Sequence, residues 1–335
     1  MHHIAWLTTG GTIACQQDQQ GLTPRLDGRQ LRALLGSLID QYEIEIMDLF
    51  ALDSSNIQPE EWQRIAGQIA DLVQKGKVDG VLLTHGTDTM AYTAAALSFM
   101  LENVPFPVVL TGSQLPLNHP LSDGPENIRT ALAMAASGKP GVYIAFNRTI
   151  MLGTRAVKVR TTHFQAFESV NEKNAGWIDS RGLNIRESVL PSLHGSFRLR
   201  PQLCQNVVLI KLIPGMDPRL FDALMQMKVQ GVVIEAFGIG GLSFVRRDLS
   251  AKLRQMTEQG ITVVVCSQCL YEPSDFSVYE VGQKVLRYGV LEGKDMTSEA
   301  AVTKLMWVLG QTSDPVEIRA LFERSLVGER SSESD

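Results

Sequence analysis

The 335-residue sequence has little of several features that would assign a protein to a class. It has no run of 18 or more apolar residues, so we expect no membrane-spanning helix. Its 31 Lys and Arg are outnumbered by 36 Asp and Glu, for a net charge of -5, which gives no electrostatic basis for binding nucleic acid. Residues 1–7 contain no basic stretch followed by an apolar core. We therefore expect no signal peptide and a cytoplasmic protein.

Cysteine is also scarce. The four residues are Cys15, Cys204, Cys266 and Cys269, a number that fits a reducing compartment and predicts no disulfide framework. Cys266 and Cys269 form a CxxC pair, but the pair follows an apolar strand and no second pair exists. We therefore interpret both as structural rather than as a redox motif or half of a zinc site.

The first 150 residues alternate apolar runs with amphipathic stretches. The clearest helix is Pro59–Lys75, where apolar residues recur at helical spacing, proline suits the first position and Lys75-Gly76 is a stop signal. Further helices are expected at Thr89–Leu101 and Pro125–Ala136. Short apolar runs predict strands at Ile4–Thr8, Ile44–Leu49, Gly80–Thr84, Val108–Thr111 and Val142–Phe146.

This alternation breaks near residues 186–206 and then resumes. Strands are expected at Val207–Leu212, Gly231–Ala236 and Ile261–Cys266, with helices near Pro218–Met227, Asp248–Gln259, Thr297–Leu309 and Pro315–Arg324. The pattern predicts an α/β protein with two α/β domains. A larger N-terminal domain, residues 1–188, has a mainly parallel sheet with flanking helices. A linker at 189–206 leads to a smaller C-terminal α/β domain at 207–335.

Polar residues follow four successive predicted strands. The segments are Thr8–Ala14, Asp53–Asn56, Thr84–Met90 and Thr111–Gln114. Ligands of parallel α/β sheets bind beyond the carboxyl ends of the strands, so these loops predict a cleft for a small polar molecule. Each loop alone has a plainer interpretation, as a Gly-Gly turn or as a helix N-cap.

The residue types in these loops suit acyl transfer. A threonine hydroxyl is a poor nucleophile that needs a base, and the base needs an orienting charge. Lys158, in a short basic stretch, could be that base if it lies beside a carboxylate and a hydroxyl. Backbone N–H groups around glycines can bind the oxyanion of the tetrahedral intermediate. We expect His85 to position its loop rather than to react.

At TGGTI and HGTDTMAYT the sequence closely resembles the bacterial-type L-asparaginases, and most of all their cytoplasmic (type I) branch. The likeness covers nearly the whole chain and includes DSSN, TGSQLP, GTRAVKVRT, EAFGIGG, SQCLYEPSDFSVYEVG and TKLMWVLGQ. The resemblance implies hydrolysis of L-asparagine to L-aspartate and ammonia through a threonine nucleophile and an acyl-enzyme. It also implies that no metal and no organic cofactor are used.

The resemblance further implies a role for each matching residue. Thr12 corresponds to the nucleophile on a flexible loop. Thr87, Asp88 and Lys158 correspond to the group that activates the nucleophile or transfers protons. The sequence leaves open which of the two threonines carries the acyl group.

The same resemblance implies how substrate is held. Ser54, Ser55, Thr87 and Asp88 match positions that bind the α-carboxylate and α-amino groups. Glu280 matches an acid that a neighbouring subunit supplies, so a homo-oligomer, either a dimer or a tetramer, is expected. We expect L-asparagine as the small-molecule partner, with no nucleic acid and no membrane.

Two positions depart from the family pattern. Leu22 stands in the loop after TGGT where many members have a tyrosine that hydrogen-bonds the nucleophile, although part of the cytoplasmic branch shares this GLxP pattern. Glu235 replaces an arginine used by an allosteric asparagine site in some cytoplasmic members, and Val157 replaces a threonine beside the lysine. We therefore predict little or no cooperativity.

Three alternatives stay open. A glutaminase or broader amidase differs by a methylene of substrate, which alters the fit by about 1–3 kcal/mol. An ammonia-releasing subunit of a tRNA-dependent amidotransferase would be expected to carry an added domain, for which 335 residues leave no space. A catalytically silent amino-acid-binding protein is favoured only by the missing loop tyrosine.

Overall fold

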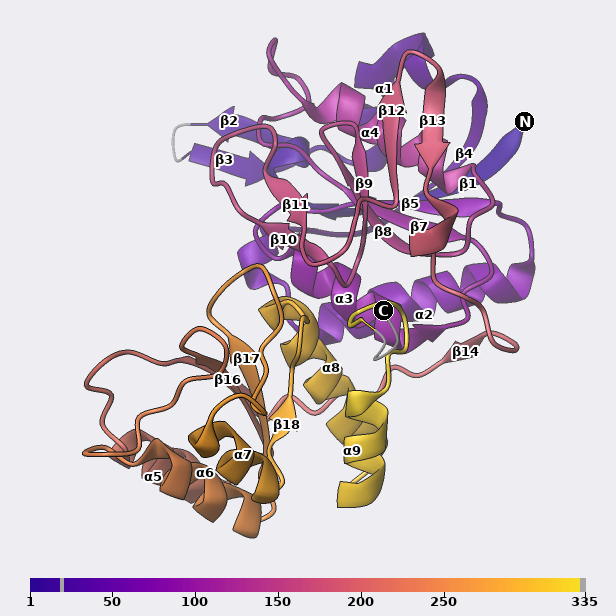
Figure 1. Cartoon of the computed structure of the whole chain (residues 1–335). Coiled ribbons are helices and arrows are strands. Elements are labelled where there is room, and N and C mark those ends of the chain that lie inside the picture. Colours follow the sequence, from indigo (N-terminus) through magenta and orange to yellow (C-terminus); the bar gives the residue numbers. More distant parts are fainter. Residues whose placement is uncertain (19–20, 332–335) are drawn as a thin grey trace. The chain divides into compact units, whose positions relative to one another are not determined.

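The computed structural model describes residues 1–18 and 21–331 (Figure 1). The chain divides into two compact units, the first ending at Pro201 and the second beginning at Gln202. The second unit thus begins inside the segment predicted as a linker, and the expected domain limits at 188 and 207 stay a prediction. No helix in the described part of the chain is long and apolar enough to cross a membrane.

The first unit is built on an eight-stranded sheet of order β13-β12-β9-β8-β7-β5-β1-β4. The parallel strands are β1 (His2–Gly10), β4 (Tyr42–Leu52), β5 (Gly80–Thr84), β7 (Pro107–Thr111) and β8 (Gly141–Phe146). Three antiparallel strands extend it: β9 (Thr149–Leu152), β12 (Gly176–Asp179) and β13 (Gly182–Ile185). The five parallel strands are those that the apolar runs predict.

Helices cover both faces of this sheet (Figure 1). Helices α1 (Gly28–Leu35) and α4 (Gly124–Ala135) lie on one face, and α2 (Pro59–Lys75) and α3 (Met90–Met100) on the other. Helix α2 has the predicted limits because Pro59 occupies its first turn and Gly76 ends it in the left-handed conformation. Helix α3 is buried on nearly every side, which its small alanines permit.

Strand β1, which lies between β5 and the edge strand β4, is buried on both faces. Ile4 and Trp6 enter the core cluster that includes Leu31 of α1 and Ile128 of α4. All four side chains are fully buried. A parallel strand covered on both sides needs a continuous apolar run, which is why residues 4–7 could be recognised as a strand.

The strand order fixes where a ligand site can form. After β1 the chain passes to β4 on one side, and it then crosses to β5 on the other side and continues through β7 to β8. This is the topological switch of doubly wound sheets, and the crevice at such a point lies outside the carboxyl ends of the strands that flank it. The loops that follow β1 and β5 are therefore the expected place for a site.

Several short elements of the first unit were not expected from the sequence. They are the hairpin β2 (Cys15–Asp18) and β3 (Gly21–Pro24), the pair β10 (Ala156–Lys158) and β11 (Phe167–Ser169), the pair β6 (Leu101–Glu102) and β14 (Arg198–Leu199), and the 3-10 turns η1 (Thr12–Ala14), η2 (Gly36–Ile39), η3 (Ser54–Asn56) and η4 (Glu187–Val189). Most are too short to leave a periodic pattern.

The second unit is a smaller α/β domain. Its sheet is parallel throughout and has the order β15 (Val207–Lys211), β16 (Gly231–Ala236), β17 (Thr262–Ser267) and β18 (Leu291–Glu292). Its helices are α5 (Arg219–Gln226), α6 (Leu249–Glu258), α7 (Glu280–Arg287), α8 (Ser298–Gln311) and α9 (Pro315–Glu323). The fold class predicted from the alternating pattern is confirmed.

A buried ion pair fastens the carboxyl-terminal segment to α8. Lys304 Nζ contacts the Glu329 carboxylate, and both side chains are fully buried. Lys304 also donates to the Arg324 carbonyl at 2.6 Å, and Glu329 accepts the backbone N–H of Val327 at 2.8 Å. Burial lowers the pKa of Lys304, against the opposing effect of Glu329.

We expect Lys304→Met to lower the free energy of unfolding of the second unit by about 3–5 kcal/mol, because it leaves the Glu329 charge buried without its partner. The double variant Lys304→Met with Glu329→Gln removes both charges and should recover most of that loss. Urea unfolding measures both, followed by the part of the tryptophan fluorescence that comes from Trp307 of α8, since Trp6, Trp62 and Trp177 belong to the first unit. Equal stability of the single and double variants would contradict the expectation.

Candidate active site

Three polar loops of the first unit pack against one another through glycines. They follow β1, β4 and β5. A Cβ atom added at Gly11 would come closer than 3.0 Å to the backbone of Gly86, and one added at Gly86 would lie 2.7 Å from Ser54 Cβ and 3.2 Å from Gly11 Cα. Gly11 also has a φ of +78°. Glycine is therefore required at both positions. Thr12 and Thr87 directly follow these two glycines, at the point where the two backbones are in contact.

The Thr87 hydroxyl contacts a lysine that is held by a carboxylate. Lys158 Nζ, at the end of β10, is 2.8 Å from Thr87 Oγ1 and 2.6 Å from Asp88 Oδ1. Thr87 is 5% exposed, and the Lys158 and Asp88 side chains are 18% and 64% exposed. The lysine therefore faces the hydroxyl rather than bulk water. Hydroxyl, amine and carboxylate form the sequence of contacts that nucleophile activation requires.

Asp88 and Thr87 do not cap the helix that follows them. Helix α3 begins at Met90 with Thr89 at the N-cap position, and no side chain caps it. The N-cap interpretation of Thr87 and Asp88 is therefore wrong. The Thr89 hydroxyl instead donates to the Ser54 carbonyl at 2.7 Å and ties the loop after β4 to the start of α3.

The second hydrogen bond of Thr87 leads to the loop after β7. Thr87 Oγ1 donates to Gln114 Oε1 at 3.3 Å, and Gln114 Nε2 donates to the Thr161 carbonyl at 3.0 Å. Asp123 accepts the backbone N–H of Gln114 at 3.0 Å. Gln114 therefore links Thr87 to the segment that follows Lys158, and Asp123 fixes its backbone.

Neither Gln114 nor Asp123 was predicted to be a site residue. Asp123 precedes Gly124 and Pro125, where the pattern is that of an ordinary helix N-cap. In the structure its side chain makes no capping bond to α4. It also accepts from Asn127 Nδ2 at 2.9 Å. Only the tertiary contact with the loop after β7 distinguishes it from a cap.

The loop after β4 presents two serines in different environments. Ser54 is 3% exposed and packs against Gly86. Ser55 is exposed, and its hydroxyl donates to Asp53 Oδ1 at 2.6 Å. This hydrogen bond, together with that from the Ser55 backbone, lowers the pKa of Asp53. Ser54 therefore lies inside the group of packed loops, and Ser55 lies at its surface.

Thr12 begins the 3-10 turn η1 and is partly exposed. Within the described part of the chain, no group hydrogen-bonds its hydroxyl. The thiol of Cys15, three residues on, donates to the Gly11 carbonyl at 3.4 Å, and burial raises the pKa of Cys15 to about 11. That thiol is therefore protonated and unreactive. The side chain of Leu22, expected to replace a tyrosine, lies outside what the structure describes.

Glu280 lies in the second unit, where it is the exposed first residue of α7. It thus belongs to a different unit from Thr87, Asp88 and Lys158. Its expected role, as an acid given to a neighbouring subunit, stays a prediction.

The two cysteines of the CxxC pair lie in different environments. Cys266 is buried at the end of β17 whereas Cys269 is exposed, and both are free thiols. Burial raises the pKa of Cys266 to about 12, so its thiol is protonated at neutral pH. Among the residues that the structure describes, no group of three or more His, Cys, Asp or Glu is arranged to hold a metal ion.

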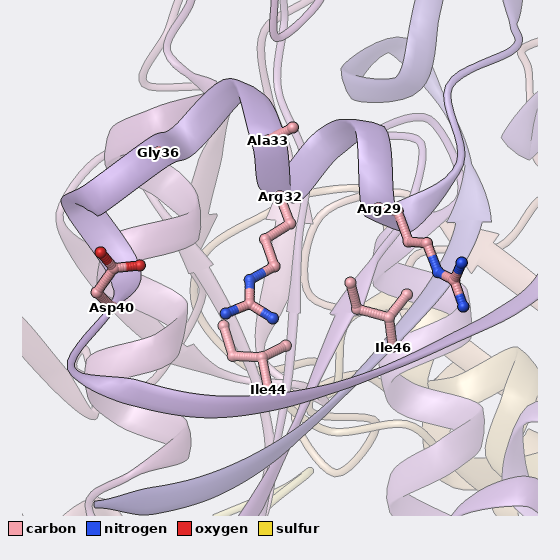
Figure 2. Close-up of a pocket in the computed structure, with 7 residues that line it drawn as sticks. All are labelled: Arg29, Arg32, Ala33, Gly36, Asp40, Ile44 and Ile46. Carbon is pink, nitrogen blue, oxygen red and sulfur yellow. The ribbon is translucent and has the colours of Figure 1, made fainter.

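A separate pocket of about 580 Å³ lies between α1, η2 and β4 (Figure 2). Arg32 extends from α1 toward Ile44 and Ile46 of β4, and Asp40 lies on the opposite side of Arg32 from Ile46. None of the residues that line it comes from the loops after β1, β4 or β5. It is therefore no part of the candidate active site.

Comparisons with known proteins agree with this division into units. Residues 3–190 match the family model "Asparaginase, N-terminal", and residues 206–322 match "Glutaminase/Asparaginase C-terminal domain". An L-asparaginase of Thermococcus kodakarensis is 42% identical over 325 residues, which span 96% of this chain and 97% of that protein. A glutamyl-tRNA(Gln) amidotransferase component from Pyrococcus furiosus is 35% identical, over 97% of this chain and 76% of that protein.

Solved structures are similar as well. The thermostable L-asparaginase from Thermococcus kodakarensis superposes with a TM-score of 0.92 at 41% identity, covering 99% of this chain and 100% of that chain. A probable cytoplasmic L-asparaginase from Campylobacter jejuni superposes with a TM-score of 0.83 at 28% identity, covering 97% and 100%. With both family models matched and relatives similar over almost its whole length, this chain belongs to the asparaginase family.

Proposed function

We propose that the protein hydrolyses L-asparagine to L-aspartate and ammonia through a threonine nucleophile. The observation that carries the proposal is the contact of Lys158 Nζ with Thr87 Oγ1 at 2.8 Å and with Asp88 Oδ1 at 2.6 Å. Thr87 and Asp88 follow β5, one of the two strands at the topological switch point of the main sheet, and Lys158 comes from the end of β10. The substrate and the reaction are proposed from the relatives that are named L-asparaginase.

In the proposed reaction, Thr12 attacks the side-chain amide carbon of L-asparagine and forms a C–O bond. Its proton passes through the Thr87 hydroxyl to Nζ of Lys158, which acts as the base, and Asp88 stabilises the resulting ammonium. Lys158 then delivers a proton to the leaving nitrogen as the C–N bond breaks and ammonia departs. The direct contact of Lys158 with Thr87 also supports attack by Thr87 itself, with Thr12 orienting the carbonyl.

The second half of the reaction repeats these steps with water. Water attacks the aspartyl ester, its proton goes to the amine of Lys158, and a proton returns to the threonine oxygen as L-aspartate leaves. Backbone N–H groups of the two glycine loops stabilise the oxyanion in both halves. No step of this scheme needs a metal or an organic cofactor.

Ser54, Ser55 and Asp88 are proposed to hold the α-carboxylate and α-amino groups of the substrate. Asp88 suits this role because its carboxylate is partly exposed while it also contacts Lys158. Glu280 is proposed to reach the site from a neighbouring subunit of a homo-oligomer, either a dimer or a tetramer. We place the protein in the cytoplasm, as the name of the Campylobacter jejuni relative suggests for that protein.

The function is tested by ammonia release from L-asparagine, L-glutamine and D-asparagine by the purified protein. We expect the highest kcat/KM with L-asparagine. A higher value with L-glutamine would favour a glutaminase, since the two substrates differ by one methylene. No release from any of the three would favour a binding protein and contradict the proposal.

We predict a hyperbolic dependence of rate on L-asparagine concentration. Glu235 stands where some cytoplasmic members have an arginine, and a carboxylate repels the carboxylate of a second asparagine molecule. Its Oε1 accepts from Ser298 at 2.6 Å, and Lys211 lies 3.8 Å away, so it is already held by its own unit. Val157 is buried and offers no hydroxyl. A Hill coefficient well above one in steady-state kinetics would contradict the prediction.

A further inference from the structure

The imidazole of His85 is part of a buried chain of hydrogen bonds beneath the loop that holds Thr87. Trp62 Nε1 donates to Thr93 Oγ1 at 2.9 Å, and Thr93 Oγ1 is 2.9 Å from His85 Nε2. His85 Nδ1 lies 2.7 Å from the carbonyl oxygen of Gly86. His85 and Thr93 are fully buried, and Trp62 is 7% exposed.

The two groups at the ends of this chain of hydrogen bonds, the Gly86 carbonyl and the Trp62 indole, determine which atom donates and which accepts at each step. The Gly86 carbonyl can only accept, so His85 Nδ1 must carry a proton. Burial lowers the pKa of His85 to about 4, against the opposing hydrogen bond to Gly86, so the ring is neutral and its Nε2 is an acceptor. The Thr93 hydroxyl then donates to Nε2, and its oxygen accepts from the indole of Trp62, which can only donate.

The hydrogen bond from His85 Nδ1 to the Gly86 carbonyl fixes the orientation of the peptide plane between Gly86 and Thr87. In a trans peptide the carbonyl and the next N–H point in opposite directions, and the described chain has no cis bond. Because the Gly86 carbonyl points to the buried ring of His85, the N–H of Thr87 points away from it. That N–H has no hydrogen-bond partner among the described residues.

We propose that His85 is a positioning residue, which in its neutral Nδ1–H form fixes the Gly86 carbonyl and thereby the backbone N–H and hydroxyl of Thr87 at the site of reaction. The inference rests on the proposed function, because the positioned residue is the threonine that Lys158 contacts. Small displacements of Thr87 change its 2.8 Å contact with Lys158 directly. Because His85 is fully buried, its proposed effect is exerted through Thr87, which makes it a positioning residue rather than a catalytic one.

Two substitutions separate positioning from packing. His85→Asn keeps an N–H donor at the place of Nδ1 and loses the acceptor at Nε2, whereas His85→Gln keeps a polar group near Nε2 and loses the donor to Gly86. We expect the Gln variant to lose about 10²-fold in kcat with little change in KM, as for a displaced reacting group. The Asn variant should retain most of its turnover. Similar kcat values for the two folded variants would overturn the proposal.

The tautomer is tested without any activity measurement. A long-range ¹H–¹⁵N spectrum of the wild-type protein with labelled histidine should contain one ring with Nδ1 protonated and Nε2 unprotonated at neutral pH. That signal should vanish in His85→Asn. If the ring whose signal is lost in His85→Asn is instead protonated at Nε2 alone, or at both nitrogens, the proposed hydrogen-bond directions are refuted whatever the kinetics. Wild-type protein that shows the expected tautomer but releases no ammonia contradicts the proposed function instead, so the two failures are distinguishable.

Discussion

Thr12→Val and Thr87→Val should each lower kcat for ammonia release from L-asparagine by about 10³–10⁵-fold, the scale of a lost nucleophile or of its activating group. Valine replaces the hydroxyl by a methyl group of similar size, so the loops keep their packing. At Thr87 the change removes the oxygen that lies 2.8 Å from Lys158 Nζ and 3.3 Å from Gln114 Oε1. Steady-state kinetics on each purified variant measures the loss.

A matched control separates the missing hydroxyl from a general effect of valine. Thr130→Val alters a buried threonine of α4 whose hydroxyl donates within its own helix, to the Glu126 carbonyl at 2.9 Å. It should leave turnover within about threefold, since this bond stabilises the helix little. Thr12→Ser should keep much of the activity because the oxygen remains. If Thr12→Val or Thr87→Val keeps more than a tenth of wild-type turnover, the threonine mechanism is wrong.

The same variants identify the residue that carries the acyl group. A slowly hydrolysed substrate should trap the aspartyl ester, and peptide mapping by mass spectrometry should locate it. We expect the label on the peptide that contains Thr12, with less of it in Thr87→Val because activation is lost. Label on the peptide that contains Thr87 would assign the attack to that residue.

Lys158→Met should lower kcat by about 10²–10⁴-fold, the usual contribution of a general base or acid. Methionine keeps the unbranched side chain as far as Cε but can neither accept the proton of Thr87 nor pair with Asp88. The Lys158 side chain is only 18% exposed, so solvent cannot readily replace it. Initial rates at saturating L-asparagine measure the effect, with Lys139→Met, which alters an exposed lysine paired with Glu187, as the control.

Lys158→Arg tests whether charge alone explains the role of this lysine. An arginine side chain keeps the positive charge and can still pair with Asp88, but it does not lose its proton in proteins. A base is therefore absent in both variants, and both should be impaired. Activity near wild type in Lys158→Arg would show that the lysine acts only by its charge. In addition, the losses in Thr87→Val and Lys158→Met should be far from additive, because the two residues are in contact.

The fold could be predicted well wherever the chain is covered on two sides. Strands β1, β5, β7 and β8 are buried at almost every residue, and such runs are recognisable in a sequence. Helix α2 was predicted with its limits because proline, acidic residues and glycine mark its two ends.

Elements without such marks were missed. Strands β9, β12 and β13 have four residues each and take their register from antiparallel partners rather than from their own pattern. Helix α1 was missed as well, although the sequence does mark its start, since Asp27 and Gln30 form a capping box. Helix α7 has eight residues, of which only Gly282 and Val285 are buried, so its apolar stripe is short.

For the candidate site, the sequence supplied the chemistry and the structure supplied the neighbours. Thr87, Asp88 and Lys158 were named from their motifs, and the structure brings these three into contact although Lys158 is 70 residues from Asp88. Gln114 and Asp123 were not named, because their importance lies in contacts across the fold.

By itself the sequence determined two α/β units, the positions of the main strands along the chain and the residue types available at their carboxyl ends, because burial and turn chemistry depend on local patterns of residues. Tertiary structure decided which of those residues meet. The strand order places the loops after β1 and β5 on either side of the switch point, and glycines at positions 11 and 86 let their backbones touch. Hydrogen-bond direction along Trp62, Thr93 and His85 likewise exists only in the folded state, because donors and acceptors act at distances of about 3 Å that no local pattern records.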